Sequence, residues 1–139
     1  MNLVRIPRQA NFVCPEGKYR AKVIQCIVMD DQPSDEGPVQ MIKVNFQVFV
    51  PNAKNVEYRA GKKMLLSWES GSPFRQLVTI LRGRDLTPEE IEQGQWDVDQ
   101  LLGLEADIKV VQIKNRGHLN PYSAIMGFFP VGTFVTSAT

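Results

Sequence analysis

The sequence predicts a mainly β protein, in which five antiparallel strands form a small barrel and a helix lies between the third and fourth strands. Two observations lead to this class. Several segments alternate apolar and polar residues with a period of two, which is typical of strands with one buried face. One segment after the third of these carries apolar residues at helical spacing between recognisable cap residues.

The first three strands are expected to follow one another as a meander. Residues 18–30 are rich in strand-forming residues, and a turn with two prolines follows them. Residues 40–50 alternate almost without fault. Their apolar set is Ile42, Val44, Phe46, Val48 and Val50, and the opposite face carries Lys43, Asn45, Gln47 and Phe49. Residues 56–68 return as the third strand, in which Gly61 is expected to form a bulge or bend.

Helical signals separate this meander from the last two strands. Ser72 is a predicted N-cap, Pro73 takes the first helical position, and Gly83 lies just beyond the end. A second short helix is expected over residues 86–94, with Thr87 as its cap and Pro88 at its start.

The stretch QWDVDQLLGLEADIKVV (95–111) predicts one helical turn that runs directly into a strand. Asp97 and Asp99 suit the N-terminus of the turn, Leu101 and Leu102 are expected to be buried, and Gly103 ends it. We expect this turn to align the fourth strand (105–115) beside the earlier ones. The fifth strand is expected over residues 122–130.

Three strands, a helix and a two-stranded hairpin follow the order of an OB-fold. A plain antiparallel sandwich with a helix across one end fits the same periods. Residues 1–15 are taken as an N-terminal arm, 16–130 as the domain and 131–139 as a C-terminal tail. The predicted core comprises Ile42, Val44, Phe46, Val48, Leu77, Leu81, Ile108 and Val110.

Composition excludes several classes of protein. The 139 residues suit one domain, and no apolar run approaches the ~20 residues of a membrane span. The N-terminus lacks the apolar stretch of a secretory signal, so a cytoplasmic location is expected. Cys14 and Cys26 are expected to be reduced structural thiols, and with only one histidine we expect neither metal nor cofactor.

The formal net charge of +1 conceals alternating blocks of charge. Residues 1–29 and 37–84 are basic, with net charges of +4 and +6. Residues 30–36 and 85–107 are acidic, with −4 and −8. Either two solvated loops happen to be acidic, or the molecule has a basic side that follows a phosphate chain.

Four motifs occur in an order that resembles a group of phage-encoded single-stranded DNA-binding proteins. They are EGKYRAKV, SPFRQLVTILRG, WDVDQLLGLEADIKV and the closing YSAIMGFFP. The resemblance covers roughly residues 16 to 130. It implies an OB-fold that binds single-stranded DNA in phage or prophage replication or recombination, inside the bacterial host cell. Homo-oligomers and replication or recombination proteins are further candidate partners, and RNA is the alternative ligand.

Binding of single strands without sequence preference needs cations along the phosphates and exposed aromatic rings on which bases stack. The strands and the last loop offer both. The candidate residues are Tyr19, Arg20, Lys22, Lys43, Asn45, Phe49, Tyr58, Arg59, Lys62, Lys63, Trp68, Lys114, Arg116, His118 and Tyr122. Each also has a structural interpretation: Phe49 packs under the helix, Trp68 belongs to the core, and the lysines only contact solvent.

Catalysis is not expected. His118 stands alone, and no Gly-x-Ser-x-Gly, P-loop or HExxH motif is present. Glu89 and Glu90 fall in the first turn of a predicted helix, where acids favour the dipole and need no metal. The second functional hypothesis is an OB-like module or phage structural component that binds protein through its acidic segments.

Overall fold

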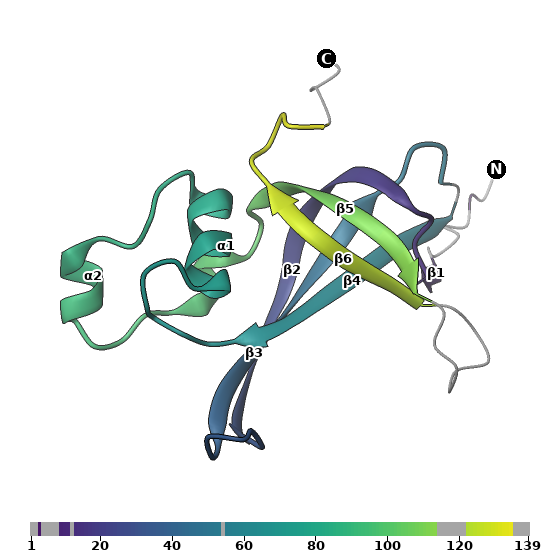
Figure 1. Ribbon diagram of the computed structural model, residues 1–139. Coiled ribbons are helices and arrows are strands. Elements are labelled where there is room, and N and C mark those ends of the chain that lie inside the picture. Colours follow the sequence, from purple (N-terminus) through teal and green to yellow (C-terminus); the bar gives the residue numbers. More distant parts are fainter. Residues whose placement is uncertain (1–2, 4–8, 12, 54, 114–121, 135–139) are drawn as a thin grey trace.

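One twisted sheet with the strand order β1-β4-β3-β2-β5-β6 dominates the structure (Figure 1). The computed structural model describes residues 3, 9–11, 13–53, 55–113 and 122–134. Its strands are β1 (Gln9–Asn11), β2 (Gly17–Gln32), β3 (Val39–Phe49), β4 (Val56–Leu65), β5 (Glu105–Ile113) and β6 (Tyr122–Phe129). Its helices are α1 (Pro73–Arg82), α2 (Pro88–Glu92) and the 3-10 turn η1 (Val98–Leu101). Strands β2 to β6 pair antiparallel, so the predicted mainly β class is confirmed.

Strand β2 joins the two halves of the sheet. It pairs with β3 along most of its length, whereas β5 pairs with it only over residues 17–22. The register against β3 shifts between Val23 and Gln25, and such a bulge bends a strand and increases its twist. Beyond Met41, where β4 ends, β2 and β3 continue as a hairpin that extends away from the other strands (Figure 1).

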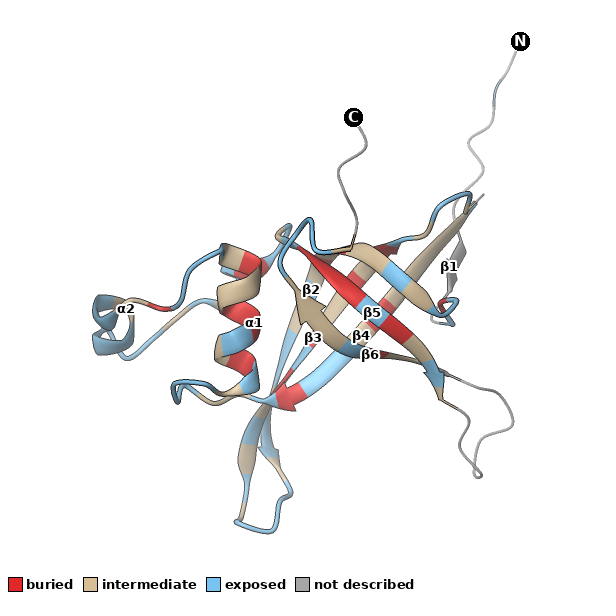
Figure 2. Cartoon of the chain, turned by 45° about the horizontal axis from the view of Figure 1, so that its top comes forward, coloured by how far each residue is buried: buried red, intermediate tan, exposed pale blue. Residues whose placement is uncertain are grey.

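The core lies on the face predicted by the alternation in β3. All eight predicted core residues are buried, and Ile42, Val44, Phe46 and Ile108 are completely inaccessible. The alternation of buried and more accessible positions along the strands is visible in Figure 2. The ring of Phe128 on β6 packs against Phe46, with the ring centroids 5.3 Å apart.

Helix α1 begins and ends where its cap residues predict. The Ser72 hydroxyl accepts a hydrogen bond from the Arg75 N–H (3.3 Å), and Pro73 is the first helical residue. Gly83 ends the helix with φ +76°, a left-handed conformation that favours glycine, and its N–H donates to the Thr79 carbonyl. The helix buries Phe74, Leu77, Val78 and Leu81 against one end of the sheet (Figure 2).

The turn before β5 aligns that strand as expected. Asp97 caps η1, and Gly103 follows it with φ +84°. The Gly103 N–H donates to the Val23 carbonyl, and the Val23 N–H donates to the Leu104 carbonyl (both 2.9 Å). These two bonds attach the start of β5 to β2 at the bulge. Leu101 is buried, but the expectation for Leu102 is wrong, since its side chain is 44% exposed.

Three further expectations need correction. The register of β3 and β4 is continuous through Gly61, so no bulge forms there. A Cβ at this position would lie 2.5 Å from Asn45 Oδ1, so glycine instead leaves room for that side chain. Strand β4 ends at Leu65, three residues earlier than predicted, and the segment taken as an N-terminal arm contains β1, which pairs parallel with β4.

Both cysteines are free, as expected. Burial raises the pKa of Cys14 to about 11, and burial with the nearby Asp99 carboxylate raises that of Cys26 to about 11. Neither thiol is therefore an activated nucleophile at neutral pH. Within the described ranges no group of three or more His, Cys, Asp or Glu side chains is arranged to hold a metal. No helix there has the length and apolar character needed to cross a membrane.

Two phenylalanines on opposite faces of β3 test the assignment of the core. Phe46→Ala should lower the free energy of unfolding by about 3 kcal/mol, because it opens a cavity in a fully buried site. Phe49→Ala is the matched control: that side chain is 41% exposed, and we expect a much smaller loss. Urea denaturation of both variants measures the difference, and equal losses would contradict the assignment.

Candidate nucleic-acid interface

Seven of the candidate residues lie on the surface of β2, β3 and β4 that faces away from the core, here called the outer face. Residues paired directly across antiparallel strands share a face. Between β3 and β4, Lys43 lies opposite Lys63, Asn45 opposite Gly61, and Gln47 opposite Arg59. On the other side of β3, Arg20 lies opposite Phe49 and Lys22 opposite Gln47. The seven residues are Arg20, Lys22, Lys43, Asn45, Phe49, Arg59 and Lys63.

Two lysines face one another at one end of this surface. Lys43 and Lys63 are direct cross-strand partners, and both are exposed. Like charges in directly opposed positions destabilise a sheet. In the part of the chain that the structure describes, neither forms an ion pair with a carboxylate. A bound anion would remove this repulsion, so the pair is better suited to a negatively charged ligand than to the free protein alone.

The two arginines of the outer face already contact carboxylates. Arg59 bonds to Glu57, two residues away on the same face of β4, with an Nη2–Oε2 distance of 2.6 Å. Arg20 donates from Nε to Asp107 Oδ1 at 3.3 Å. The charge available for an external ligand therefore comes mainly from the lysines.

Asp107 marks the boundary of the outer face on the β5 side. It is an outward-facing residue of β5, yet it is completely buried, because residues 130–134 pass over it. The N–H groups of Gly132 and Phe134 donate to its Oδ2 at 3.1 and 2.8 Å. The Phe134 ring packs edge-on against Phe129, and Lys18 Nζ lies 4.7 Å from the centroid of the Phe134 ring.

Phe49 lies on the outer face, which excludes the alternative in which it packs under the helix. Its side chain is 41% exposed and lies across from Arg20, at the end of β3. An exposed ring among cations has the chemistry that base stacking requires.

Three of the other candidates lie elsewhere. Tyr19 and Tyr58 occupy inward-facing positions, opposite Ile108 and Val48, and pack against the core. Burial raises the pKa of Tyr19, and its hydroxyl donates to the Glu16 carbonyl. Lys62 lies opposite Val44 on the same inward-facing side, and its exposed side chain lines a depression between β4, α1 and β6.

Four further candidates lie in the sequence between the end of β5 and the first residue of β6. Lys114, Arg116 and His118 lie outside the described residues. The backbone of Tyr122 pairs with Ile113 at the start of β6, and its side chain is likewise outside the description.

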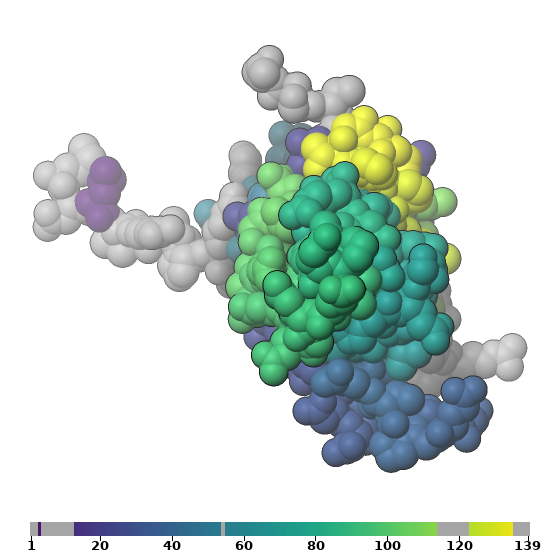
Figure 3. Space-filling view, turned by 90° about the vertical axis from the view of Figure 1, so that its left-hand side faces the viewer, coloured from purple at the N-terminus to yellow at the C-terminus, as the bar shows by residue number. Residues whose placement is uncertain are grey.

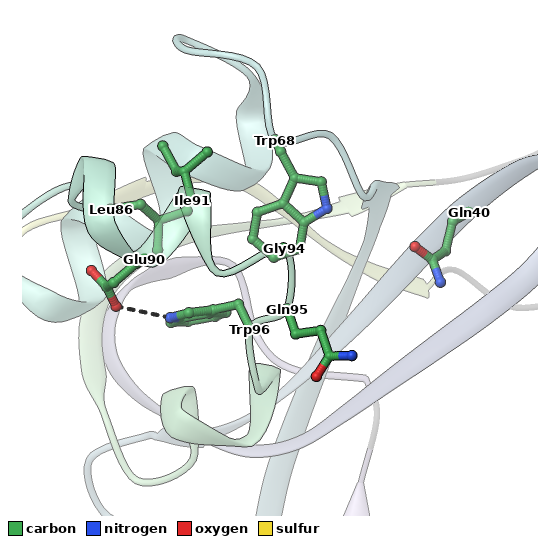
Figure 4. A pocket seen from close by; sticks show the side chains of 8 residues that line it. All are labelled: Gln40, Trp68, Leu86, Glu90, Ile91, Gly94, Gln95 and Trp96. Atoms are coloured by element: carbon green, nitrogen blue, oxygen red, sulfur yellow. Dashed lines mark hydrogen bonds between the residues drawn. The ribbon is translucent and has the colours of Figure 1, made fainter.

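Trp68 lines a pocket of about 410 Å³ that includes none of the outer-face residues (Figure 4). Trp96, which no sequence motif indicated as a site residue, lines the same pocket. The other lining residues are Gln40, Leu86, Glu90, Ile91, Gly94 and Gln95. Trp68 packs edge-on against buried Phe74, with the centroids 5.3 Å apart, and against Trp96 at 6.2 Å. It is thus neither a core residue nor part of the basic surface.

Glu90 holds one wall of this pocket in place. Its Oε1 accepts from the Thr87 N–H at 3.0 Å and from Arg82 Nη2 at 3.1 Å, and its Oε2 accepts from Trp96 Nε1 at 3.0 Å. The hydrogen bond from Thr87 and those from Arg82 and Trp96 lower the pKa of Glu90 to about 2. The capping box of α2 and the orientation of Trp96 therefore depend on one ionised carboxylate.

Comparison with known proteins adds no relatives: no protein-family model and no curated protein sequence matches the chain. Functional inference therefore depends on the chemistry of these two sites.

The pKa of Glu90 predicts a specific loss of stability in acid. A carboxylate whose pKa in the folded state is below its ordinary value of 4.5 stabilises the fold fully above pH 4.5. That contribution is lost as the pH falls towards about 2. Glu90→Gln should therefore reduce stability most above pH 4.5, and its difference from the wild type should shrink in acid.

Urea unfolding at a series of pH values, followed by tryptophan fluorescence, measures this difference. Glu92→Gln is the matched control, since Glu92 is an exposed carboxylate on the same helix. Parallel pH profiles for Glu90→Gln and the wild type would show that the network around Glu90 contributes nothing.

Proposed function

We propose that this protein binds single-stranded DNA on its outer face without strong sequence preference. Phosphates would lie along Lys22, Lys43 and Lys63, and a base would stack on Phe49. Cations that follow the backbone and an aromatic ring open to a base are the two requirements for such binding. RNA has the same phosphates and bases and is the alternative ligand.

The observation that carries the proposal is the opposed pair Lys43 and Lys63 on the surface that also exposes Phe49. A solvated polar face of a sheet more commonly alternates charges of opposite sign across neighbouring strands. Here the sheet places two lysines directly opposite each other, with no carboxylate partner among the described residues, and an aromatic ring on the same strand as one of them. Asn45, which donates to Gln25 Oε1 (3.0 Å), and Gln47 lie between them and offer amide groups for further hydrogen bonds.

The strand arrangement supports an OB-like barrel for this domain. Strands β2, β3 and β4 form the meander, and β5 and β6 form the hairpin that returns to β2. Strands β4 and β6 contact each other, although their pairing is not part of the described sheet. In OB-folds the second and third strands and two loops bind oligonucleotides, and β3 and β4 would be those strands in the barrel that we propose.

The biological setting that we propose follows from the sequence resemblance described above. A chain with the motif order of phage-encoded single-stranded DNA-binding proteins would act in phage or prophage replication or recombination, in the bacterial cytoplasm. We propose no catalytic activity. A protein-binding role is the second candidate, and the acidic pocket around Trp68 and Trp96 is the observation that favours it.

A gel shift with labelled oligonucleotides tests the proposal directly. The protein should retard a single strand of mixed sequence at low salt, and duplex of the same sequence should compete poorly. Tighter binding to duplex, or no retardation of any single strand, would refute the proposed function.

Binding should weaken steeply with salt. If three to five phosphates are neutralised, log K should fall with log salt at a slope of about −2 to −4, because each released counterion contributes about −0.7 for single strands. Fluorescence anisotropy of a labelled oligonucleotide at several salt concentrations gives the slope. An affinity that is indifferent to salt would exclude binding through the lysines.

Substitutions on the outer face should separate stacking from charge. Phe49→Ala should weaken binding by roughly 5- to 150-fold with little change in the salt slope, as expected for the loss of one stacked base. Lys43→Ala should reduce the magnitude of the slope by about 0.7 with a smaller loss of affinity. Leu102→Ala is the control and should change neither quantity, because Leu102 is an exposed apolar residue between η1 and β5 and is not part of the outer face.

A further inference from the structure

The pocket between Trp68 and Trp96 is formed by segments that are distant in sequence. Gln40 comes from the start of β3 and Trp68 follows β4, whereas Leu86, Glu90, Ile91 and Trp96 belong to the excursion around α2. Its volume of about 410 Å³ lies within the range of pockets that hold small molecules or single large side chains. Trp68 and Ile91 are 39% and 44% exposed, so apolar surface is open to solvent at its mouth.

The walls of the pocket are fixed before any ligand arrives. Trp96 is hydrogen-bonded to Glu90, and the Arg82 guanidinium lies 5.6 Å from its ring centroid. Trp68 is held by its edge-on contact with Phe74, a completely buried residue of α1. A partner would therefore spend little free energy on ordering these rings.

The surroundings of the pocket are acidic. Glu89 and Glu92 on α2 and Asp97 and Asp99 at η1 are exposed, and none of them forms an ion pair with another described residue. The other acidic segment, residues 30–36, also begins beside the pocket, because the side chain of Gln40, which lines the pocket, donates to Asp30 Oδ1 at 2.7 Å. Figure 3 shows the end of the β2–β3 hairpin (blue) next to the helical segments (teal and green) on one face of the molecule.

We propose that this acidic tryptophan pocket docks a cationic segment of a partner protein, which inserts one large apolar side chain between Trp68 and Trp96. The apolar walls bind the side chain, and the surrounding carboxylates attract lysines or arginines on either side of it. The same carboxylates repel the phosphates of nucleic acid. This site is thus distinct from the outer face, and it gives both acidic segments one common role.

The tryptophan fluorescence of the protein, excited where tyrosine does not absorb, reports on this pocket alone, since both tryptophans of the chain line it. The probe is the blocked peptide Lys-Arg-Gly-Phe-Gly-Arg-Lys, titrated into the full chain at low salt. We expect a saturable change in emission that weakens as salt is added. A peptide with glycine in place of phenylalanine, and one with glutamate in place of every basic residue, should each bind at least about tenfold more weakly.

Two variants with a matched control locate the binding. Ile91→Ser should weaken the peptide about tenfold by removing apolar lining, and Glu92→Lys about fivefold by reversing one charge. Leu65→Ser is the control, since Leu65 is as exposed as Ile91 (46% against 44%) but lies outside the pocket. Circular dichroism of each variant shows that its fold is retained.

Three results would overturn the proposal. The first is no fluorescence change with the peptide, or a change that Ile91→Ser and Glu92→Lys leave unaltered. The second is a single-stranded oligonucleotide that changes tryptophan emission and loses affinity in Ile91→Ser, which would make the pocket a nucleic-acid site. The third is a dimer in analytical ultracentrifugation that Ile91→Ser dissociates, which would make a second copy the occupant. A failed gel shift leaves this proposal standing, because the outer face and the pocket share no residue.

Discussion

The arrangement of this protein depends on the bent strand β2, which is the one strand bonded to both halves of the sheet. Its register shift at Val23 and Gln25 changes which residues face the core, and at the same point its backbone bonds to Gly103 and Leu104. The bulge therefore curves the meander at the place where the ladder between β2 and the start of β5 ends. These two bonds and the pairing of residues 17–22 with β5 set the register of the chain that returns from the helices, and a one-residue slip would turn every core residue of β5 to solvent.

The fold also separates the basic residues of the chain from the acidic ones. Basic residues alternate with core residues along β2, β3 and β4, so pleating brings them together on the outer face. Acidic residues concentrate in the excursion around α2 and η1 and at the end of the β2–β3 hairpin, which meet at the tryptophan pocket. A net charge near zero thus results from two surfaces of opposite sign, and net charge alone gives a poor guide to what such a molecule binds.

Period and capping signals predicted the elements because they depend on neighbours in sequence. The alternation in β3 identified its buried set, and Ser72 and Thr87 were recognisable as caps from local spacing alone. The features that sequence did not predict depend on contacts across the chain. Strand β1 has only three residues, which are too few to show a period. Trp96 becomes a pocket residue only because the fold brings it beside Trp68. Asp107 looked like part of an acidic surface, but residues 130–134 bury it.

The burial of Asp107 has a consequence for how the outer face can be used. On the β5 side this face ends in a carboxylate that is already satisfied by two backbone N–H groups and an arginine, beneath a segment of chain. Towards β4, Lys43 and Lys63 are exposed, and neither has a carboxylate partner among the described residues. The polyanion that we propose would consequently lie over β3 and β4, with Phe49 at one end of its path. Arg20 would stabilise the fold through Asp107 and would contribute less to the ligand than its position beside Phe49 suggests.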